Sequence, residues 1–150
     1  MDTGQRKDTM KTICVIDGQG GGIGSALIRQ IKARYGESIE ILALGTNAIA
    51  TAQMLKAKAN RGASGENAIV QTVRRVDLIL GPIGIIMAHS MMGEVTVRMA
   101  EAVASSGCPK VLLPLSQERV AIVGAPAIPL PRLIEQLIEE HLVPFLNQGA

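Results

Sequence analysis

Residues 13–25 read Ile13-Cys14-Val15-Ile16-Asp17-Gly18-Gln19-Gly20-Gly21-Gly22-Ile23-Gly24-Ser25, and this stretch decides the fold. A mostly apolar run enters a loop with five glycines in seven residues, and apolar side chains then recur at helical spacing. The order predicts a buried strand, a loop and a helix whose N-terminus points back at the loop. The glycines leave few Cβ atoms there, and a helix N-terminus presents unpaired N–H groups. The sequence therefore predicts a corner suited to a phosphate or another anion.

The rest of the chain alternates between apolar strands and amphipathic helices. The predicted strands are 12–17, 39–44, 76–80, 110–115 and 120–123, and the predicted helices are 22–35, 47–60, 64–75, 91–105 and 131–145. A four-residue link before 120–123 favours a hairpin, so this strand is expected to be antiparallel and at the edge. The pattern predicts a three-layer, Rossmann-like α/β fold with a mostly parallel sheet of order 2-1-3-4 plus the edge hairpin strand. Residues 1–10 are expected to be a flexible tail and 11–150 a single domain.

Two glycine loops are expected to meet where the strand order reverses, above the first and third strands. Open α/β sheets bind ligands in the crevice at this topological switch point. The second loop is Gly81-Pro82-Ile83-Gly84. The candidate binding residues are Gly18, Gln19, Gly20, Gly21, Gly22, Ile23, Gly24, Asn47, Gly81, Pro82 and Ile83.

The spacing Gly18-x-x-x-Gly22-x-Gly24 resembles the glycine fingerprint of short-chain dehydrogenases. The Tyr-x-x-x-Lys pair of that family is missing, because the only tyrosine, Tyr35, is followed four residues later by Ile39. No carboxylate follows the second strand to hold a ribose, and no Walker lysine follows the loop. The cofactor stays open between NAD(P) and another nucleotide. The alternative is that the glycines only permit close packing of the helix on the strand.

Asp17 and Asn47 stand at the carboxyl ends of the first two predicted strands. Asp17 could accept a proton, bind a ligand hydroxyl or magnesium, or hydrogen-bond the amides of its own turn. Asn47 could bind a ligand hydroxyl or cap the helix that follows it. The sequence leaves these alternatives open.

A second polar cluster, His89, Ser90 and Glu94, invites a catalytic interpretation. The simpler expectation is that Ser90 caps the helix over 91–105 and that Glu94 pairs with Arg98. Arg119 follows the fourth strand on the ligand-binding edge, where it either meets an anion or lies in solvent. The histidines and cysteines are scattered without ligand spacing, so no metal site is predicted.

The composition excludes several classes of protein. With 47% hydrophobic and 19% charged residues and a net charge of +2, the chain lacks the basic footprint of a nucleic-acid binder. Its longest uncharged run, 78–93, is too short for a membrane span, and its two cysteines fit a reducing cytoplasm. We expect a cytoplasmic homo-oligomer with a small phosphorylated ligand and with neither a nucleic-acid nor a membrane partner.

From Val15 to Gly24, and again through Gly65-Glu66-Asn67-Ala68-Ile69 and Gly81-Pro82-Ile83-Gly84-Ile85, the chain resembles a small bacterial family of domains of unknown function. The resemblance covers most of residues 11–125. It implies a Rossmann-like fold and a compact single domain, and it carries no activity. The residues thus favour a protein that binds a nucleotide or another phosphorylated small molecule. The alternative is a homo-oligomeric scaffold or regulatory subunit, with interfaces at 120–123 and at the Met-rich segment 85–92.

Overall fold

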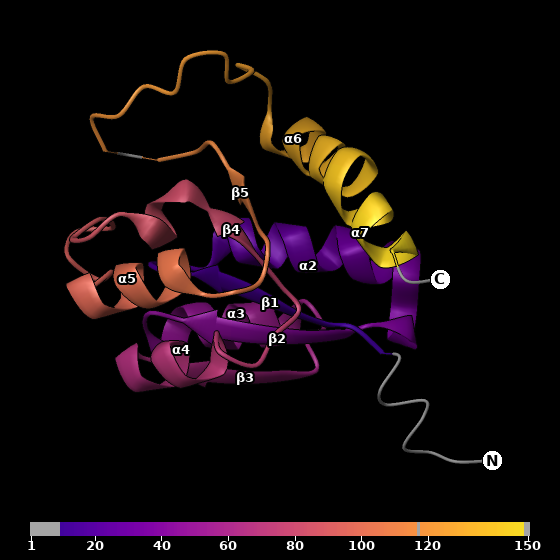
Figure 1. Ribbon diagram of the computed structural model, residues 1–150, viewed down its shortest axis with the longest axis horizontal. Coiled ribbons are helices and arrows are strands. Elements are labelled where there is room, and N and C mark those ends of the chain that lie inside the picture. The colour runs from indigo at the N-terminus through magenta and orange to yellow at the C-terminus, as the bar shows by residue number, and fades with distance from the viewer. Residues whose placement is uncertain (1–9, 117, 149–150) are drawn as a thin grey trace.

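The protein is built on a five-stranded parallel sheet with helices on both faces, in a computed structural model that describes residues 10–116 and 118–148 (Figure 1). The strands are β1 (Thr12–Asp17), β2 (Glu40–Gly45), β3 (Arg61–Ser64), β4 (Leu78–Pro82) and β5 (Lys110–Leu113). They lie in the order β3-β2-β1-β4-β5, and each neighbouring pair is parallel. The predicted α/β fold class is confirmed, and β2, β1, β4 and β5 keep the predicted order 2-1-3-4. The expected tail falls mainly on residues 1–9, outside the described residues.

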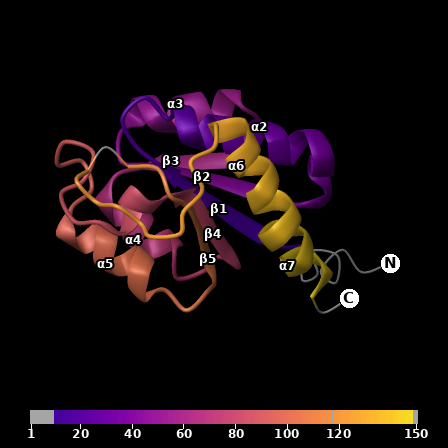
Figure 2. The same ribbon diagram turned by 90° about the horizontal axis from the view of Figure 1, so that it is seen from above.

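The helices fall into two layers. They are α2 (Gly22–Tyr35), α3 (Ala48–Lys56), α4 (Glu66–Thr72), α5 (Val97–Ser105), α6 (Leu130–Leu137) and α7 (Val143–Asn147), with short turns η1 (Gly36–Ser38), η2 (Ile83–Ile86) and η3 (Ile138–Leu142). Seen from above, α2, α3 and α6 lie on one side of the sheet, and α4 and α5 lie on the other (Figure 2). None of the described helices is long and apolar enough to cross a membrane.

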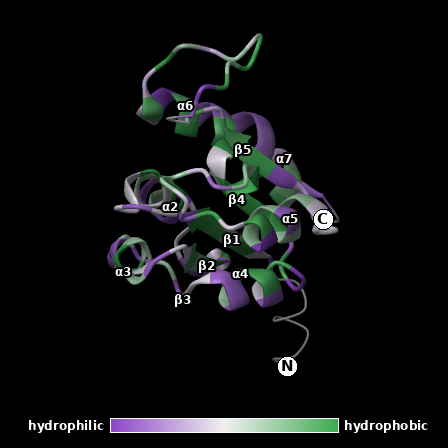
Figure 3. Cartoon of the chain, turned by 90° about the vertical axis from the view of Figure 1, so that its left-hand side faces the viewer, coloured by the Kyte–Doolittle hydropathy of each residue, from purple (hydrophilic) through white to green (hydrophobic). Residues whose placement is uncertain are grey.

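Alternate residues of β1 feed two separate hydrophobic cores. Ile13 and Val15 pack with α2 and α6, whereas Cys14 and Ile16 pack with α4 and α5. This is the two-sided burial expected of a parallel strand covered on both faces. The central strands are accordingly hydrophobic along their length (Figure 3). Both cores fix β1 in place, and with it the glycine loop at its carboxyl end.

The fifth strand was predicted in the wrong place. Residues 120–123 form no strand, and the side chains of Val120, Ile122 and Val123 are exposed. Strand β3 instead lies at the other edge, parallel to β2, and overlaps the segment 62–67 that was predicted to be a loop. Its side chains are all exposed, so its sequence carries no hydrophobic alternation.

The helix boundaries in the structure differ most from the predicted ones around residues 87–96. The predicted helix 91–105 begins only at Val97, because His89, Met91 and Met92 adopt left-handed backbone conformations that an α-helix cannot contain. Thr96 caps α5 by accepting a hydrogen bond from Met99 N–H, so the prediction that Ser90 caps it is wrong. The segment 87–94 crosses the carboxyl edge of the sheet, and we call it the strap.

The other helices agree better with the sequence. The prediction of one helix over 131–145 holds in outline, as α6, η3 and α7 follow one another without a break. Helix α3 ends at Lys56, short of the predicted 60, and α4 ends at Thr72, short of 75. Gly65 rather than the expected Ser64 is the N-cap of α4.

Candidate functional site

A pocket of about 260 Å³ lies at the carboxyl ends of β1 and β4. The glycine loop forms one wall through Asp17 and Gln19, and the turn after β4 forms another through Pro82. The strap contributes Met91, and the segment after β5 contributes Glu118. This is the switch-point crevice predicted from the strand order, and none of the described residues that line it is basic.

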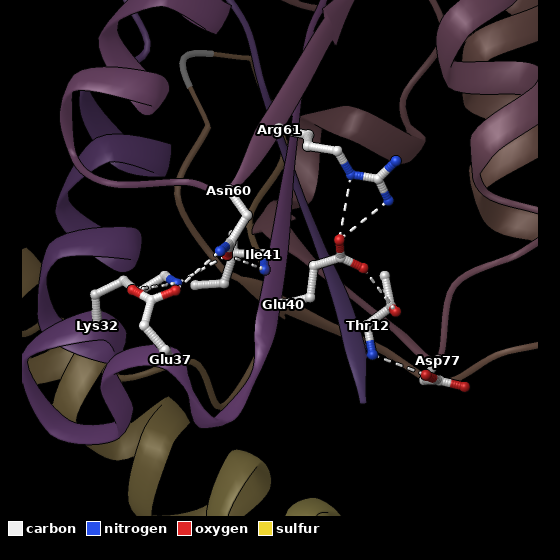
Figure 4. Close-up of polar contacts among 8 residues, drawn as sticks. All are labelled: Thr12, Lys32, Glu37, Glu40, Ile41, Asn60, Arg61 and Asp77. Atoms are coloured by element: carbon white, nitrogen blue, oxygen red, sulfur yellow. Dashed lines mark hydrogen bonds and ion pairs between the residues drawn. The ribbon is translucent and has the colours of Figure 1, made fainter. Parts of the chain in front are cut away.

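A larger hollow, about 370 Å³, lies near the amino ends of β1 and β2, beside β3 and α4. Its rim is braced by polar contacts, with Arg61 Nη2 3.1 Å from Glu40 Oε2 and Thr12 N–H donating to Asp77 Oδ2 at 2.8 Å (Figure 4). Parallel α/β sheets bind ligands at the carboxyl ends of their strands. We therefore take the smaller crevice as the candidate site.

Asp17 ends β1 beneath the glycine loop and organises it. Its carboxylate accepts hydrogen bonds from Gly18 N–H at 2.8 Å and from Gly24 N–H at 2.7 Å, and its side chain is buried. Burial raises the pKa of Asp17, and the loop amides oppose this rise. The alternative that Asp17 bonds the amides of its own turn is confirmed, while a role in proton transfer or ligand binding stays a prediction.

The glycines of the loop divide into two groups. A Cβ on Gly18 would lie 2.5 Å from Thr46 Oγ1, and one on Gly24 would lie 2.6 Å from Met54 Sδ. Gly21 has φ +73° and a Cβ there would lie 2.8 Å from a backbone oxygen. These three glycines serve packing and backbone conformation, as the structural alternative supposed. A Cβ on either of the remaining two, Gly20 or Gly22, would meet no atom within 4 Å.

Glu94 reaches from the strap to the loops after β1 and β2. Its Oε1 accepts hydrogen bonds from Gln19 N–H at 2.7 Å, from Thr46 Oγ1 at 2.6 Å and from Asn47 Nδ2 at 2.9 Å. Burial works to raise the pKa of Glu94, but these hydrogen bonds together hold it below its ordinary value. The predicted pairing of Glu94 with Arg98 is wrong, since Arg98 lies 3.5 Å from the carboxylate of Glu66.

Asn47 is the N-cap of α3, as one of its two interpretations supposed. Its Oδ1 accepts a hydrogen bond from Ala50 N–H at 2.8 Å. Its Nδ2 donates to Gln19 O at 3.0 Å as well as to Glu94, so the side chain ties three segments together. Binding of a ligand hydroxyl by Asn47 stays a prediction.

Some of the remaining candidate residues lie at the crevice, and others lie away from it. Gly81 lies in β4 against β1, Pro82 lines the pocket and Ile83 begins η2. His89 and Arg119 are exposed, and neither lines the pocket. Ser90 is buried and donates through Oγ to Gly84 O at 2.5 Å.

Sequence reasoning missed Thr46 and Glu118. Thr46 directly follows β2, and its hydroxyl donates a hydrogen bond to Glu94 Oε1. Glu118 accepts a hydrogen bond from Met91 N–H at 3.2 Å and lies in a segment without periodicity. The one sequence signal was position, because both residues follow strands of the parallel sheet.

A parallel sheet with reversed strand order and a glycine loop between β1 and α2 defines this chain as a Rossmann-like α/β protein. The family described as Domain of unknown function (DUF3842) matches residues 12–145, and the chain belongs to it. The resemblance inferred from the glycine loop is thereby confirmed, and the match extends past residue 125 into α7. No curated protein matches the chain.

Proposed function

We propose that this chain is a cytoplasmic protein that binds a nucleotide or another phosphorylated small molecule in the crevice at the carboxyl ends of β1 and β4. The observation that supports this most is the open face of the glycine loop at Gly20 and Gly22. Neither residue has a positive φ, and neither has an atom within 4 Å of its Cβ position, so the fold itself does not require glycine at either place. Glycine there leaves the loop amides open to a close approach.

The surroundings of the loop fit a phosphorylated ligand in two ways. Gly22 begins the 14-residue α2, and Gly21, its N-cap, supplies no side-chain hydrogen bond. A phosphate at this end would meet N–H groups and the positive end of the helix dipole. The pocket beside it presents the acceptors Asp17 and Glu118, which suit hydroxyl or amino groups on the rest of the ligand.

A thermal-shift panel of NAD, NADP, FAD, FMN, ATP, GDP and sugar nucleotides tests this proposal. A ligand present at about a thousand times its dissociation constant stabilises the folded state by about 4 kcal/mol, so a true ligand gives a clear upward shift. Native mass spectrometry of the purified chain checks in parallel for a nucleotide that co-purifies. If no compound shifts the transition and none co-purifies, the proposal is wrong.

Replacing Gly22 with valine is expected to abolish binding of any hit while the protein stays folded. The new side chain points into open space, so it obstructs the approach to the loop without a clash inside the protein. Gly107→Val is the matched control, because Gly107 is equally open and lies outside the loop. Both variants should keep the circular dichroism of the wild type. Unchanged affinity in Gly22→Val would move the site elsewhere.

Self-association is a second proposal, and exposed apolar side chains favour it. Val123 is 99% exposed and Met92 is 93% exposed, and Val120 and Ile122 lie near Val123 in sequence. Burial of such apolar side chains against a partner makes the free energy of association more favourable. We propose a homo-oligomer, and light scattering coupled to gel filtration measures its mass. Val123→Asp should shift the chain toward the monomer if this surface forms the interface.

A further inference from the structure

Three hydrogen-bond donors from two separate loops converge on a single point above the sheet. They are Gln19 N–H from the loop after β1, and the side chains of Thr46 and Asn47 from the loop after β2. In this structure the point is filled by Glu94 Oε1, with distances of 2.6 to 2.9 Å. Convergent neutral donors that meet one anionic oxygen at these distances form a built anion site.

The occupant of that site comes from a strained segment. In the strap, His89 (φ 68°), Met91 (φ 56°) and Met92 (φ 56°) all adopt left-handed conformations. Non-glycine residues pay a conformational cost in this region, and clusters of such residues occur where a segment has a switching role. The strained strap therefore favours a second conformation more than a relaxed helix would.

Among the described residues, few hydrogen bonds join the side chains and amides of the strap to the rest of the crevice. Met91 N–H donates to Glu118 at 3.2 Å, Ser90 Oγ donates to Gly84 O at 2.5 Å, and Met87 N–H donates to Gly84 O at 3.0 Å. Apart from these, the carboxylate of Glu94 is the main polar link between the strap and the glycine loop. Release of this one carboxylate would thus remove the hydrogen bonds of the strap to the loops after β1 and β2.

We propose that Gln19 N–H, Thr46 and Asn47 form a phosphate subsite, and that Glu94 fills it as an internal substitute for the ligand until a phosphate displaces it. This inference rests on the proposed function and adds to it a second anion position, next to the open loop. A carboxylate and a phosphate cannot share three donors, because two anions at hydrogen-bond distance repel each other. Ligand binding therefore moves Glu94 out and opens the strap.

Glu94→Gln separates this role from a purely structural one. The probe is inorganic phosphate, titrated by calorimetry into the full-length chain. The variant should bind phosphate at least about tenfold more tightly than the wild type, because the competing negative charge is gone. Glu101→Gln is the control, since it removes the charge of an exposed acid on α5. It should leave the affinity for phosphate unchanged.

A second substitution shows whether the gain arises at these donors. Thr46→Val in the Glu94→Gln background keeps the shape of the side chain and removes one donor, so it should reverse most of the gain. In the wild type, saturating phosphate should speed amide hydrogen exchange in residues 89–93 as the strap opens. This measurement does not depend on the folding of any variant.

Several outcomes would overturn the inference. One is an equal affinity for phosphate in the wild type and in Glu94→Gln, and another is a gain that survives Thr46→Val. Weaker binding of ribonucleotides to Glu94→Gln would show instead that Glu94 accepts hydrogen bonds from a ribose. A nucleotide hit in the thermal-shift panel with no phosphate binding by Glu94→Gln defeats this inference alone. Failure of the whole panel defeats the proposed function.

Discussion

Replacing Gly81 with alanine is expected to lower the free energy of unfolding by about 2–3 kcal/mol, as overpacking of a close-packed interior does. A Cβ at Gly81 would lie 2.4 Å from the carbonyl oxygen of Ile16 and 3.0 Å from Ile85 Cδ1. The side chain of Ile85 can move, but Ile16 belongs to β1, which pairs with both β2 and β4. The two central strands would have to separate to admit one methyl group.

Urea unfolding followed by circular dichroism measures this loss as a lower midpoint. Gly107→Ala is the control, because its Cβ would meet nothing within 4 Å, and its free energy of unfolding should stay within about 0.5 kcal/mol of the wild type. Equal midpoints for the two variants would show that β1 and β4 are not held at this spacing. Separation of the strands would also disturb the crevice, because Pro82 and Gly84 line it and follow Gly81 closely in the chain.

The same close packing explains why the central strands could be predicted from the sequence. Strands β1 and β4 are buried on both faces, so their residues form apolar runs bounded by polar or glycine residues. Strand β3 has no such signal, because all its side chains are exposed. It forms since the edge of β2 offers backbone partners, with Leu42 opposite Arg61 and Gly45 opposite Ser64. A strand held by backbone pairing and by polar contacts such as Arg61–Glu40 is not visible in a hydrophobic pattern.

The strap shows how long-range contacts override local preference. Its methionines, alanine and glutamate favour helix, and the sequence prediction followed that preference. The partners of Glu94 are 75 and 48 residues away at Gln19 and Thr46, whereas Arg98 is only four residues away. Spacing rules for helices find the near partner and cannot find the distant ones. The glycine loop was predicted correctly because its strand, turn and helix are contiguous.

Asp17→Asn is the second substitution expected to have a large effect. The two carboxylate oxygens accept hydrogen bonds from two different loop amides, Gly18 N–H and Gly24 N–H. A carboxamide keeps one acceptor and turns an N–H₂ group toward the other amide, so one buried donor loses its partner. This costs about 1–3 kcal/mol. Urea unfolding at pH 7 measures the loss, and an unchanged midpoint would show that the loop does not depend on Asp17.

The pH dependence of that loss reports which force sets the pKa of Asp17. Burial raises this pKa above its ordinary value of 3.8, so the folded chain binds the proton more tightly than the unfolded chain does. The contribution of Asp17 to stability is therefore full below 3.8 and falls as the pH rises through the folded pKa. The difference in unfolding free energy between the wild type and Asp17→Asn should accordingly shrink across this window and level off above it.

A difference that grows with pH would mean that the amides of Gly18 and Gly24 stabilise the carboxylate more than burial destabilises it. Asp17 would then act as a fixed anion at the helix N-terminus, and a ligand phosphate would be confined to the outer amides near Gly20 and Gly22.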